Sequence, residues 1–314
     1  MQLKQIQAFH AVAKSQSFSA AATTTGLSQP TLSRLIKQLE EQIGAELVDR
    51  YHRPLQLTEA GMFYFEKSQL LLAELDTISA LTKRMAHPPK TLSIGFVPSV
   101  LYGLLPDIIA LLKQQLPDLE VQLKDISSYQ QLDALKSGEI DVGFGRFAQQ
   151  DEWVRQILLR HERYVVALPA VHPLAEVRNL RLPQLADNRL ILYHQTHLNV
   201  ADASLAGHSN IETEPLLNLF ARYGAAPFST TTVSDLQVAL GLVAAGEGIT
   251  LVPDSLKILR GQQIRYQSLL HEDATSPIYL NTLAQMTHPA FEHFLETIYQ
   301  VYEHKGITYR RQSL

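Results

Sequence analysis

The stretch SQPTLSRLIKQLEEQIGAELVDR, residues 28–50, decides how the first part of the chain folds. Ser28 is a good helix cap, and Pro30 lies in the first turn, where its missing N–H costs nothing. Gly44 is a residue at which a helix readily ends. Between these signals one helical face is polar and the other is apolar, made of Leu32, Leu35, Ile36, Leu39 and Ile43. The stretch therefore predicts a capped amphipathic helix with one buried and one solvated face.

Two shorter helices are predicted before this helix, and a hairpin after it. Apolar residues recur at three-residue steps from Leu3 to Val12, as on one buried helical stripe. In SFSAAATTTG, Ser19 is the expected N-cap of a short Ala-rich helix that ends at Gly26. The segment ELVDRYHRPLQLT has short extended parts around a polar tip. The order predicts an all-α winged helix-turn-helix domain over residues 1–57.

A long helix is predicted over residues 58–86, starting at Thr58. Its roughly 28 residues would span about 40 Å, which is too long for a small domain to bury. One set of its residues follows the alternating spacing of four and three that is typical of a coiled-coil seam, with two polar interruptions. The set is Tyr64, Ser68, Leu71, Leu75, Ile78, Thr82 and Met85. This helix is therefore expected to link two copies of the chain.

Beyond the helix, the consecutive prolines of HPPK predict a hinge at residues 87–90. Strand patterns then alternate with helix patterns, and VLYGLLPDIIALLKQQLP reads as one helix after the strand TLSIGFVP. This alternation of strand and helix patterns predicts an open α/β sheet. Residues 91–314 are expected to form two α/β lobes, with lobe I at about 91–161 and 268–300 and lobe II at about 162–267.

Composition excludes several classes of protein. The chain of 314 residues has 27 basic and 31 acidic side chains, so no global positive field draws it to nucleic acid. Residues 1–57 hold six basic and four acidic side chains, and DNA binding would depend on this local excess. There is no cysteine, and the first residues contain no secretion signal. These features predict a soluble, cytoplasmic protein without disulfides or Cys-zinc sites.

The polar face of the helix after Ser28 has side chains suited to DNA. Gln29 can pair with an adenine edge, Thr31 and Ser33 can contact phosphate or a thymine methyl, and Arg34 can reach guanine or phosphate. The same residues also suit an ordinary solvated helix face. The spacing alone leaves both interpretations open.

A second set of polar residues follows predicted strands. Ser99 lies where a strand enters a helix, Ser127 and Ser128 follow the next strand, and Arg146 ends a third. Open α/β sheets bind ligands at the carboxyl ends of their strands, and a guanidinium group matches a carboxylate. An ordinary N-cap and a surface ion pair are the alternatives for Ser99 and Arg146.

Other candidate motifs are weak. The loop histidines His194, His197 and His208 lack the spacing of a metal site. Gly246 and Gly248 belong to no dinucleotide or Walker motif. No Ser-His-Asp or HExxH arrangement is present in a convincing context. We therefore expect no metal, no cofactor and no enzymatic activity.

The block from FHAVAKSQSF to PLQLTEAG (residues 9–61) closely resembles the N-terminal signature of LysR-type transcriptional regulators. The resemblance extends over the chain and implies a periplasmic-binding-protein-like effector domain after the linker helix. It implies two sets of DNA contacts: Gln29, Pro30, Thr31, Ser33 and Arg34 in the recognition helix, with Arg50 and Arg53 in the wing. The implied partners are an inverted-repeat operator, an organic-acid effector, a second copy of the chain in a homodimer or homotetramer, and RNA polymerase, with no membrane.

Within the family, SIGFVPSVLYGLLPDII and DALKSGEIDVGFGR look like the BenM and CatM subgroup, which senses cis,cis-muconate and controls benzoate and catechol breakdown. Ser99, Ser128 and Arg146 match effector-carboxylate positions there, and Arg160 matches a residue of an additional benzoate pocket. Two features differ: Ala148 replaces a Lys, and residues 193–207 replace a proline-rich segment. The resemblance implies a small organic acid as effector, either a muconate-like dicarboxylate or an aromatic carboxylate. The alternatives are a regulator with a different inducer or none, a solute-binding protein, and an enzyme on the same scaffold.

Overall fold

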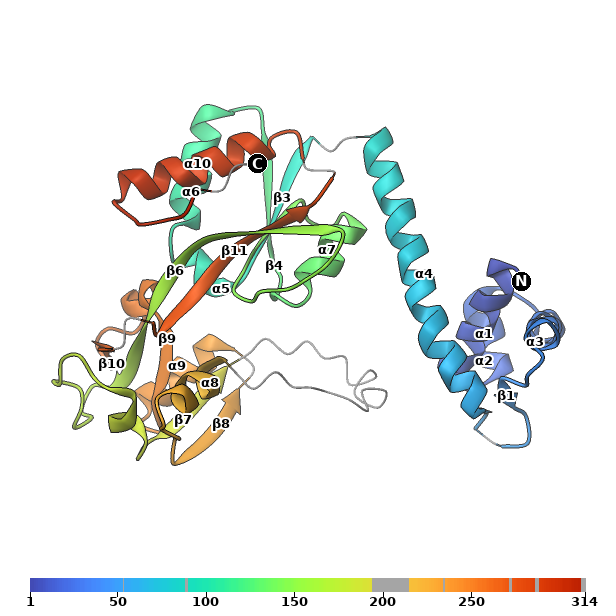
Figure 1. Ribbon diagram of the computed structural model, residues 1–314, viewed down its shortest axis with the longest axis horizontal. Coiled ribbons are helices and arrows are strands. Elements are labelled where there is room, and N and C mark those ends of the chain that lie inside the picture. Colours follow the sequence, from blue (N-terminus) through green and yellow to red (C-terminus); the bar gives the residue numbers. More distant parts are fainter. Residues whose placement is uncertain are drawn as a thin grey trace. The chain divides into compact units, whose positions relative to one another are not determined.

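A computed structural model describes residues 1–52, 54–87, 90–193, 215–233, 235–270, 273–285 and 288–311. The chain forms two compact units, Met1–Lys83 and Arg84–Leu314, each of which is visible in Figure 1. The boundary between the units falls inside the last turns of a long helix. The predicted hinge at residues 87–90 lies close by, and its residues 88 and 89 are outside the described part of the chain.

The first unit is a winged helix-turn-helix domain followed by the long helix. Its elements are α1 (Leu3–Ser15), α2 (Phe18–Thr25), α3 (Gln29–Ile43), β1 (Val48–Asp49), β2 (Gln56–Leu57) and α4 (Glu59–Ala86). Strands β1 and β2 pair antiparallel and form the wing. Phe9, Val12, Leu32, Ile36 and Leu39 are fully buried, so the apolar stripes of α1 and α3 face one core.

Local signals set most helix ends in this unit. The Ser28 hydroxyl accepts a hydrogen bond from the Thr31 backbone N–H at 3.3 Å, and Gly44 ends α3 with a φ of 80°. The prediction that Ser19 caps α2 is wrong, because Ser17 is the extended residue before the helix and its hydroxyl accepts from the Ala20 N–H. Ile43 is not buried as expected but 38% exposed, since it lies in the last turn of α3, beyond the core.

The second unit is built on a mixed sheet of seven strands. They are β3 (Thr91–Phe96), β4 (Glu120–Asp125), β5 (Val142–Gly145), β6 (Val154–Pro169), β9 (Thr250–Pro253), β10 (Ile264–Ser268) and β11 (Thr275–Leu283). Strand β3 is parallel to both β4 and β5, whereas β11 is antiparallel to β5 and β6. Strands β9 and β10 pair with β6. A separate parallel pair consists of β7 (Arg189–Tyr193) and β8 (Ser229–Val233).

Helices cover this framework in two regions with separate cores. The helical elements are α5 (Pro98–Leu101), α6 (Leu105–Gln115), α7 (Gln131–Ser137), η1 (Leu182–Leu185), α8 (Pro215–Arg222), α9 (Leu236–Ala244), η2 (Asp254–Ile258) and α10 (Phe291–His304). One core lies among β3, β5, β11, α6 and α10, and the second region has clusters around β7, α8 and α9. The 16-residue strand β6 runs from the first region into the second, as Figure 1 shows. The predicted limits of the domains and lobes stay predictions.

The single helix predicted after β3 is wrong, because the structure has two helices there. The chain turns at Gly103, whose N–H bonds to the Val100 carbonyl at 3.0 Å, and α6 then starts with Pro106 in its first turn. Proline has no N–H to continue the ladder of a preceding helix, so α5 cannot run into α6. Among the described residues, no helix is both long and apolar enough to span a membrane.

Candidate DNA-binding and effector-binding sites

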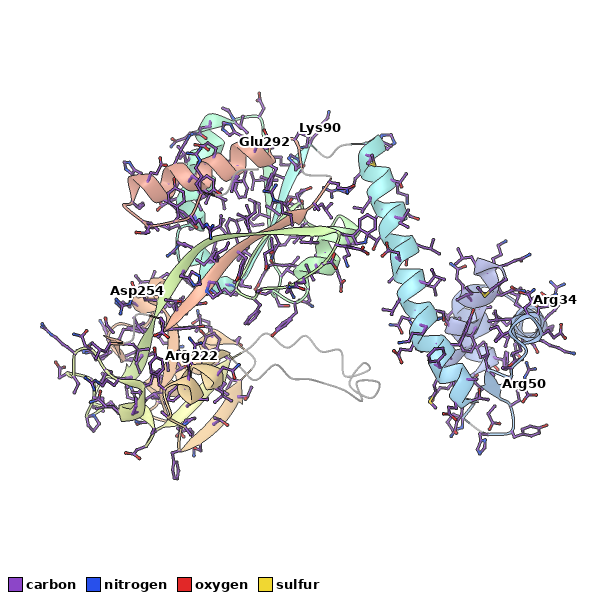
Figure 2. The ribbon with its side chains drawn as sticks, viewed as in Figure 1. Arg34, Arg50, Lys90, Arg222, Asp254 and Glu292 are labelled. Carbon is purple, nitrogen blue, oxygen red and sulfur yellow. The ribbon has the colours of Figure 1, made fainter. Side chains whose placement is uncertain are left out.

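The proposed reading residues lie at the start of α3. Gln29, Pro30 and Arg34 are exposed, and Thr31 and Ser33 are half-buried. Figure 2 shows Arg34 on the outer side of α3, and the structure gives it no ion pair with a described residue. The start of α3 therefore presents the hydrogen-bonding groups that reading a major groove needs.

Of the two wing arginines, only Arg50 is among the described residues. Arg50 donates to Glu40 at 3.0 Å and to the Ser33 hydroxyl at 3.5 Å, and its guanidinium lies 5.9 Å from the centre of the Phe18 ring. The same Glu40 carboxylate accepts from the Leu47 N–H at 2.9 Å. Arg50 is thus engaged with the helices, whereas Arg53 lies outside the described residues.

The candidate effector residues come together at the carboxyl ends of the parallel strands. Ser99 follows β3, Ser128 follows β4 and Arg146 follows β5. The Ser128 hydroxyl accepts from the Arg146 backbone N–H at 3.0 Å, and the Arg146 Nε donates to the Ser99 hydroxyl at 2.7 Å. The parallel pairing of β3 with its two neighbours brings these ends to one edge of the sheet.

Sequence reasoning missed the partners of Arg146 on the antiparallel strands. Arg146 forms an ion pair with Glu162 at 2.8 Å and donates to the Ser276 hydroxyl at 3.0 Å. Glu162 and Ser276 face each other in the register of β6 and β11. A second oxygen of Glu162 accepts from the Ser255 N–H at 2.8 Å. One signal was available: Arg160 and Glu162 are two residues apart on a strand and so share a face.

Arg160 is the second cation of this network. Its guanidinium lies 3.9 Å from Glu162 and 5.7 Å from the centre of the Tyr302 ring. The side chains of Arg146, Arg160 and Glu162 are only 10%, 12% and 4% exposed. Burial by itself raises the pKa of Glu162. Arg146, the Ser255 N–H and Arg160 together lower this pKa by more than burial raises it, so the net shift is downward and the carboxylate is ionised. Burial raises the pKa of Tyr302 to about 12, so its hydroxyl stays protonated.

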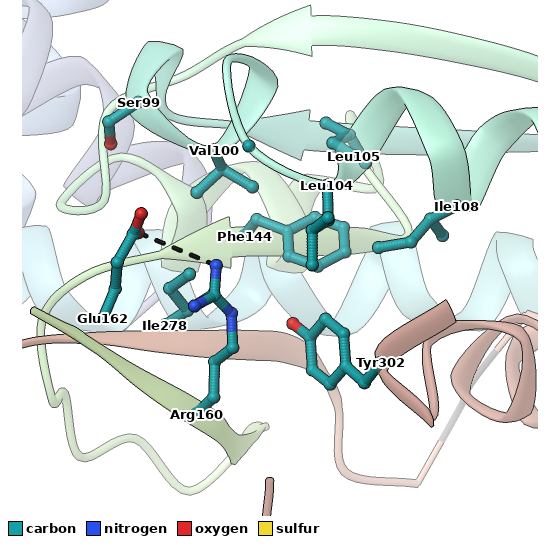
Figure 3. Close-up of a pocket in the computed structure, with 11 residues that line it drawn as sticks. Ser99, Val100, Leu104, Leu105, Ile108, Phe144, Arg160, Glu162, Ile278 and Tyr302 are labelled. Carbon is teal, nitrogen blue, oxygen red and sulfur yellow. Dashed lines mark ion pairs between the residues drawn. The ribbon is translucent and has the colours of Figure 1, made fainter. Parts of the chain in front are cut away.

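A small cavity lies next to this network. Figure 3 shows Arg160, Glu162 and Tyr302 on one side of it, with apolar side chains from α6 and the sheet on the other. The apolar lining consists of Val100, Leu104, Leu105, Ile108, Phe144 and Ile278. The cavity volume is about 10 Å³, which is room for roughly one water molecule. An aromatic acid would enter only if a lining side chain moved.

A buried amide pair fixes the end of β5. The Gln131 amide donates to the carbonyls of Ile126 and Phe144, and its oxygen accepts from Asn281 at 2.8 Å. A Cβ atom on Gly145 would lie 3.1 Å from both amides. The backbone that carries Arg146 is therefore closely packed and has little freedom to shift.

Two further features border the network. The rings of Tyr129 and Phe147, the neighbours of Ser128 and Arg146 in sequence, stack at 5.0 Å. Ala148, where the related subgroup has a Lys, is exposed. His194, His197 and His208 lie outside the described residues, and no group of metal-binding side chains exists within the described part.

Comparison with known proteins gives consistent matches over the chain. Residues 3–62 match the bacterial regulatory helix-turn-helix protein, lysR family, and residues 86–303 match the LysR substrate binding domain. The chain is 39% identical over 311 residues to the HTH-type transcriptional regulator BenM of Acinetobacter baylyi, covering 98% of each. It is 40% identical over 301 residues to the regulator CatR of Pseudomonas putida, covering 96% of this chain and 99% of that protein. A solved structure of the BenM effector binding domain with its effector benzoate aligns with a TM-score of 0.62 and 37% identity, over 71% of this chain and 97% of that one. The chain therefore belongs to the LysR family of DNA-binding transcriptional regulators.

Proposed function

We propose that this chain is a LysR-type activator that senses a small organic acid and controls the breakdown of aromatic compounds. The similar proteins BenM and CatR are named as transcriptional regulators, and benzoate is the effector in one solved structure of the BenM effector binding domain. The arrangement around Arg146 supports the same class of ligand for this chain. The effector is a carboxylic acid, either muconate-like or aromatic.

The observation that carries this proposal is the charge of the network. Arg146 and Arg160 share one carboxylate, that of Glu162, at 2.8 and 3.9 Å. The three side chains therefore hold a net charge of +1 in a poorly hydrated place. A buried charge is costly unless a counter-ion balances it. A single ligand carboxylate supplies that counter-ion.

Each residue has a distinct proposed role. Arg146 binds the ligand carboxylate through guanidinium N–H groups, while Ser99 and Ser128 donate hydroxyl protons to it. Arg160 is the alternative cation for this carboxylate, and an aromatic ring bound there lies against Tyr302 and the apolar lining. In both places the ligand carboxylate competes with Glu162 for a guanidinium group, which links ligand binding to a rearrangement of the network.

The residues around the network favour a ligand with one carboxylate group over a ligand with two. Ala148 offers no cation. The end of β4 contributes an acid, Asp125. The stacked rings of Tyr129 and Phe147 instead suit a flat, conjugated ligand. An aromatic monocarboxylate is therefore the favoured effector, ahead of muconate.

DNA recognition is proposed for the start of α3, with Gln29, Thr31, Ser33 and Arg34 facing the operator and Pro30 holding the helix start. Two copies of the chain would pair through α4 and read an inverted repeat, and two such dimers would form a homotetramer. Acid binding favours one arrangement of the effector lobes, which changes the spacing of the DNA-binding domains. The protein would act in the cytoplasm and contact RNA polymerase.

One observation favours a second candidate, a LysR-type regulator with a different inducer or none. The cavity beside Tyr302, at about 10 Å³, holds no aromatic ring as it stands. A free-standing solute-binding protein has no such support, because the helix-turn-helix family model also matches the chain.

Calorimetry on the full chain separates the two candidates. Benzoate, other aromatic monocarboxylates and cis,cis-muconate would be titrated into the wild type and into R146K, which keeps the charge but loses the planar fork. We expect at least one monocarboxylate to bind and its affinity to fall at least 10-fold in R146K. If none of the acids bound, the second candidate, a regulator with a different inducer or none, would be favoured instead.

A further inference from the structure

The tip of the wing is held in a defined shape by one acid. One oxygen of the Asp49 carboxylate accepts from the Tyr51 N–H at 2.9 Å, and the other contacts the His52 ring at 2.9 Å. A side chain that bonds to the backbone two residues on is the pattern of an Asx turn. The Tyr51 N–H bond, followed by the His52 contacts, lowers the pKa of Asp49 despite its exposure. The carboxylate is therefore ionised and keeps the first half of the tip folded.

The turn sends Arg50 and Tyr51 in different directions. Arg50 reaches back to Glu40 and Ser33 of α3 and to the Phe18 ring of α2. Tyr51 does not follow it, because 95% of its surface is exposed. Phe9, Tyr64 and Phe65 of the same unit make ring contacts with one another, and Phe9 and Phe65 are at most 9% exposed. Phe63 of α4 is 66% exposed, with the Lys67 amine 5.9 Å from its ring centre. Tyr51 is thus an aromatic side chain displayed on a rigid turn rather than one that covers the core.

The position of this turn is fixed relative to the recognition helix. The hydrogen bond from Arg50 to Ser33 joins the base of the tip to the face of α3 that carries the proposed reading residues. A second link runs through Glu40, which accepts from both Arg50 and the Val48 N–H. When α3 lies in a major groove, a rigid tip on this side of it meets the neighbouring sugar-phosphate backbone.

We propose that Tyr51 is a DNA-contacting residue, and that Arg50 is a positioning residue that holds the wing against α3. The Tyr51 ring packs on deoxyribose and its hydroxyl donates to a phosphate, an uncharged contact of the kind that sets register on the duplex. The inference rests on the proposed DNA recognition by α3. It assigns the contact at the described part of the tip to an aromatic side chain, where the family resemblance implies an arginine.

An uncharged contact has a signature that a charged one lacks. Neutralising a phosphate with Arg or Lys releases counter-ions, so removing such a residue reduces the slope of log affinity against log salt by about 1. Tyr51 is uncharged, so its removal does not change the number of counter-ions that are released when the protein binds DNA. Its loss should weaken binding by the same factor at every salt concentration.

The experiment uses the full chain and a DNA duplex selected from a random pool by the wild-type protein. Fluorescence anisotropy between about 50 and 200 mM salt would compare Y51A, Y51F and R34A with the wild type. We expect Y51A to bind roughly 5- to 10-fold more weakly with an unchanged salt slope, and Y51F, which keeps the ring but lacks the hydroxyl, to recover only part of the loss. R34A should lose both affinity and slope. Phe228→Ala, an 81% exposed aromatic residue of the second unit, is the matched control and should bind as the wild type.

Several results would overturn the proposal, and each is separate from failure of DNA recognition itself. Wild-type affinity in Y51A would exclude the contact, and a reduced salt slope in Y51A would mean that the change acts through charged neighbours. Thermal unfolding of Y51A should match that of the wild type, since the side chain is exposed; a lower melting temperature would indicate a structural role. If the wild type selects no duplex, or R34A binds normally, the recognition-helix proposal fails instead.

Discussion

At the scale of single residues, Arg146 joins the candidate effector site to the rest of the fold. It bonds to Ser99 on one side and to Glu162 and Ser276 on the other. Removing its side chain would leave the Glu162 carboxylate buried without its closest cation. Breaking a buried pair from one side typically costs about 3–5 kcal/mol of stability.

The first prediction follows from this cost of breaking the buried ion pair from one side. R146M should unfold at a clearly lower denaturant concentration than the wild type, whereas R146M/R160M/E162Q, in which all three buried charges of the network are removed, should regain most of the stability. The triple variant should bind no organic acid at the site. Urea unfolding followed by circular dichroism would compare the stabilities. Equal stability of the two variants would contradict a stabilising ion pair between Arg146 and Glu162.

His10 gives a second residue-scale prediction, in the DNA-binding unit. Its Nε2 lies 2.8 Å from the Ser68 hydroxyl, and its ring stacks on Phe65 at 4.4 Å. Burial, followed by the nearby Lys14, lowers the pKa of His10 from 6.5 to about 4. The folded unit thus prefers the neutral ring, so stability is complete above pH 6.5 and is lost as the pH falls from 6.5 towards 4, where the unfolded chain binds the proton more tightly.

Substitution of His10 by Gln should remove this pH dependence. The free energy of unfolding of the wild type should fall more steeply between pH 6.5 and 4.5 than that of H10Q, with both measured by urea unfolding. H161Q, at an exposed histidine of the second unit, is the control and should follow the wild type. A parallel fall in H10Q would show that His10 is not the titrating group.

At the scale of elements, the start of α4 is fixed by close backbone contact with the residues before the wing. Thr58 donates its N–H to Leu47 and its hydroxyl to Glu46, and its hydroxyl also accepts from the Gly61 N–H at 2.9 Å. A Cβ atom on Gly61 would lie 1.9 Å from the Leu47 carbonyl oxygen, which is far inside van der Waals contact. Only glycine lets the helix approach this closely.

Gly61→Ala should therefore destabilise the first unit, although alanine favours helix in general. We expect a loss of roughly 1–3 kcal/mol, as for overpacking at a rigid site. Gln69→Ala, at an exposed position of the same helix, should change stability little. Thermal unfolding of both variants tests this, and an unchanged or higher melting temperature for G61A would refute the close approach.

The elements also show what sequence alone can predict. Ser28, Pro30 and Gly44 determine α3 through local chemistry, and the structure confirms them. The break at Gly103 and the cap at Ser17 were missed, because competing local signals of similar strength lay beside them. The sequence predicted that Ser99, Ser128 and Arg146 lie together, since parallel strand ends share one edge. Glu162 and Ser276 were not predicted, because their place depends on the register of β6 against β11, more than 100 residues apart.

At the scale of the whole molecule, α4 carries the expectation of a dimer. In the single chain its seam residues Leu71, Leu75 and Ile78 are 48%, 36% and 45% exposed, whereas Ser68 is buried against His10. The seam therefore starts after Ser68. Apolar residues repeating on one exposed helix face need a partner to cover them.

Charges placed in the seam should separate the copies. L71E/L75E is expected to sediment as a monomer, or as a dimer if a second interface persists, and to lose at least 10-fold in affinity for an inverted-repeat duplex while keeping its helical content. Glu74→Gln, next to the seam, should assemble as the wild type. Full assembly of L71E/L75E in analytical ultracentrifugation would show that the copies pair elsewhere.

The most direct test of the central claim joins both sites in one measurement. DNase I footprints of the wild type and of R146M/R160M/E162Q would be recorded on a duplex selected by the wild type, with and without each acid of an aromatic monocarboxylate panel. One or more acids should change the region that the wild type protects, whereas the variant should protect the same DNA and respond to none of the acids. Identical wild-type footprints with every acid, or a variant that still responds, would contradict it.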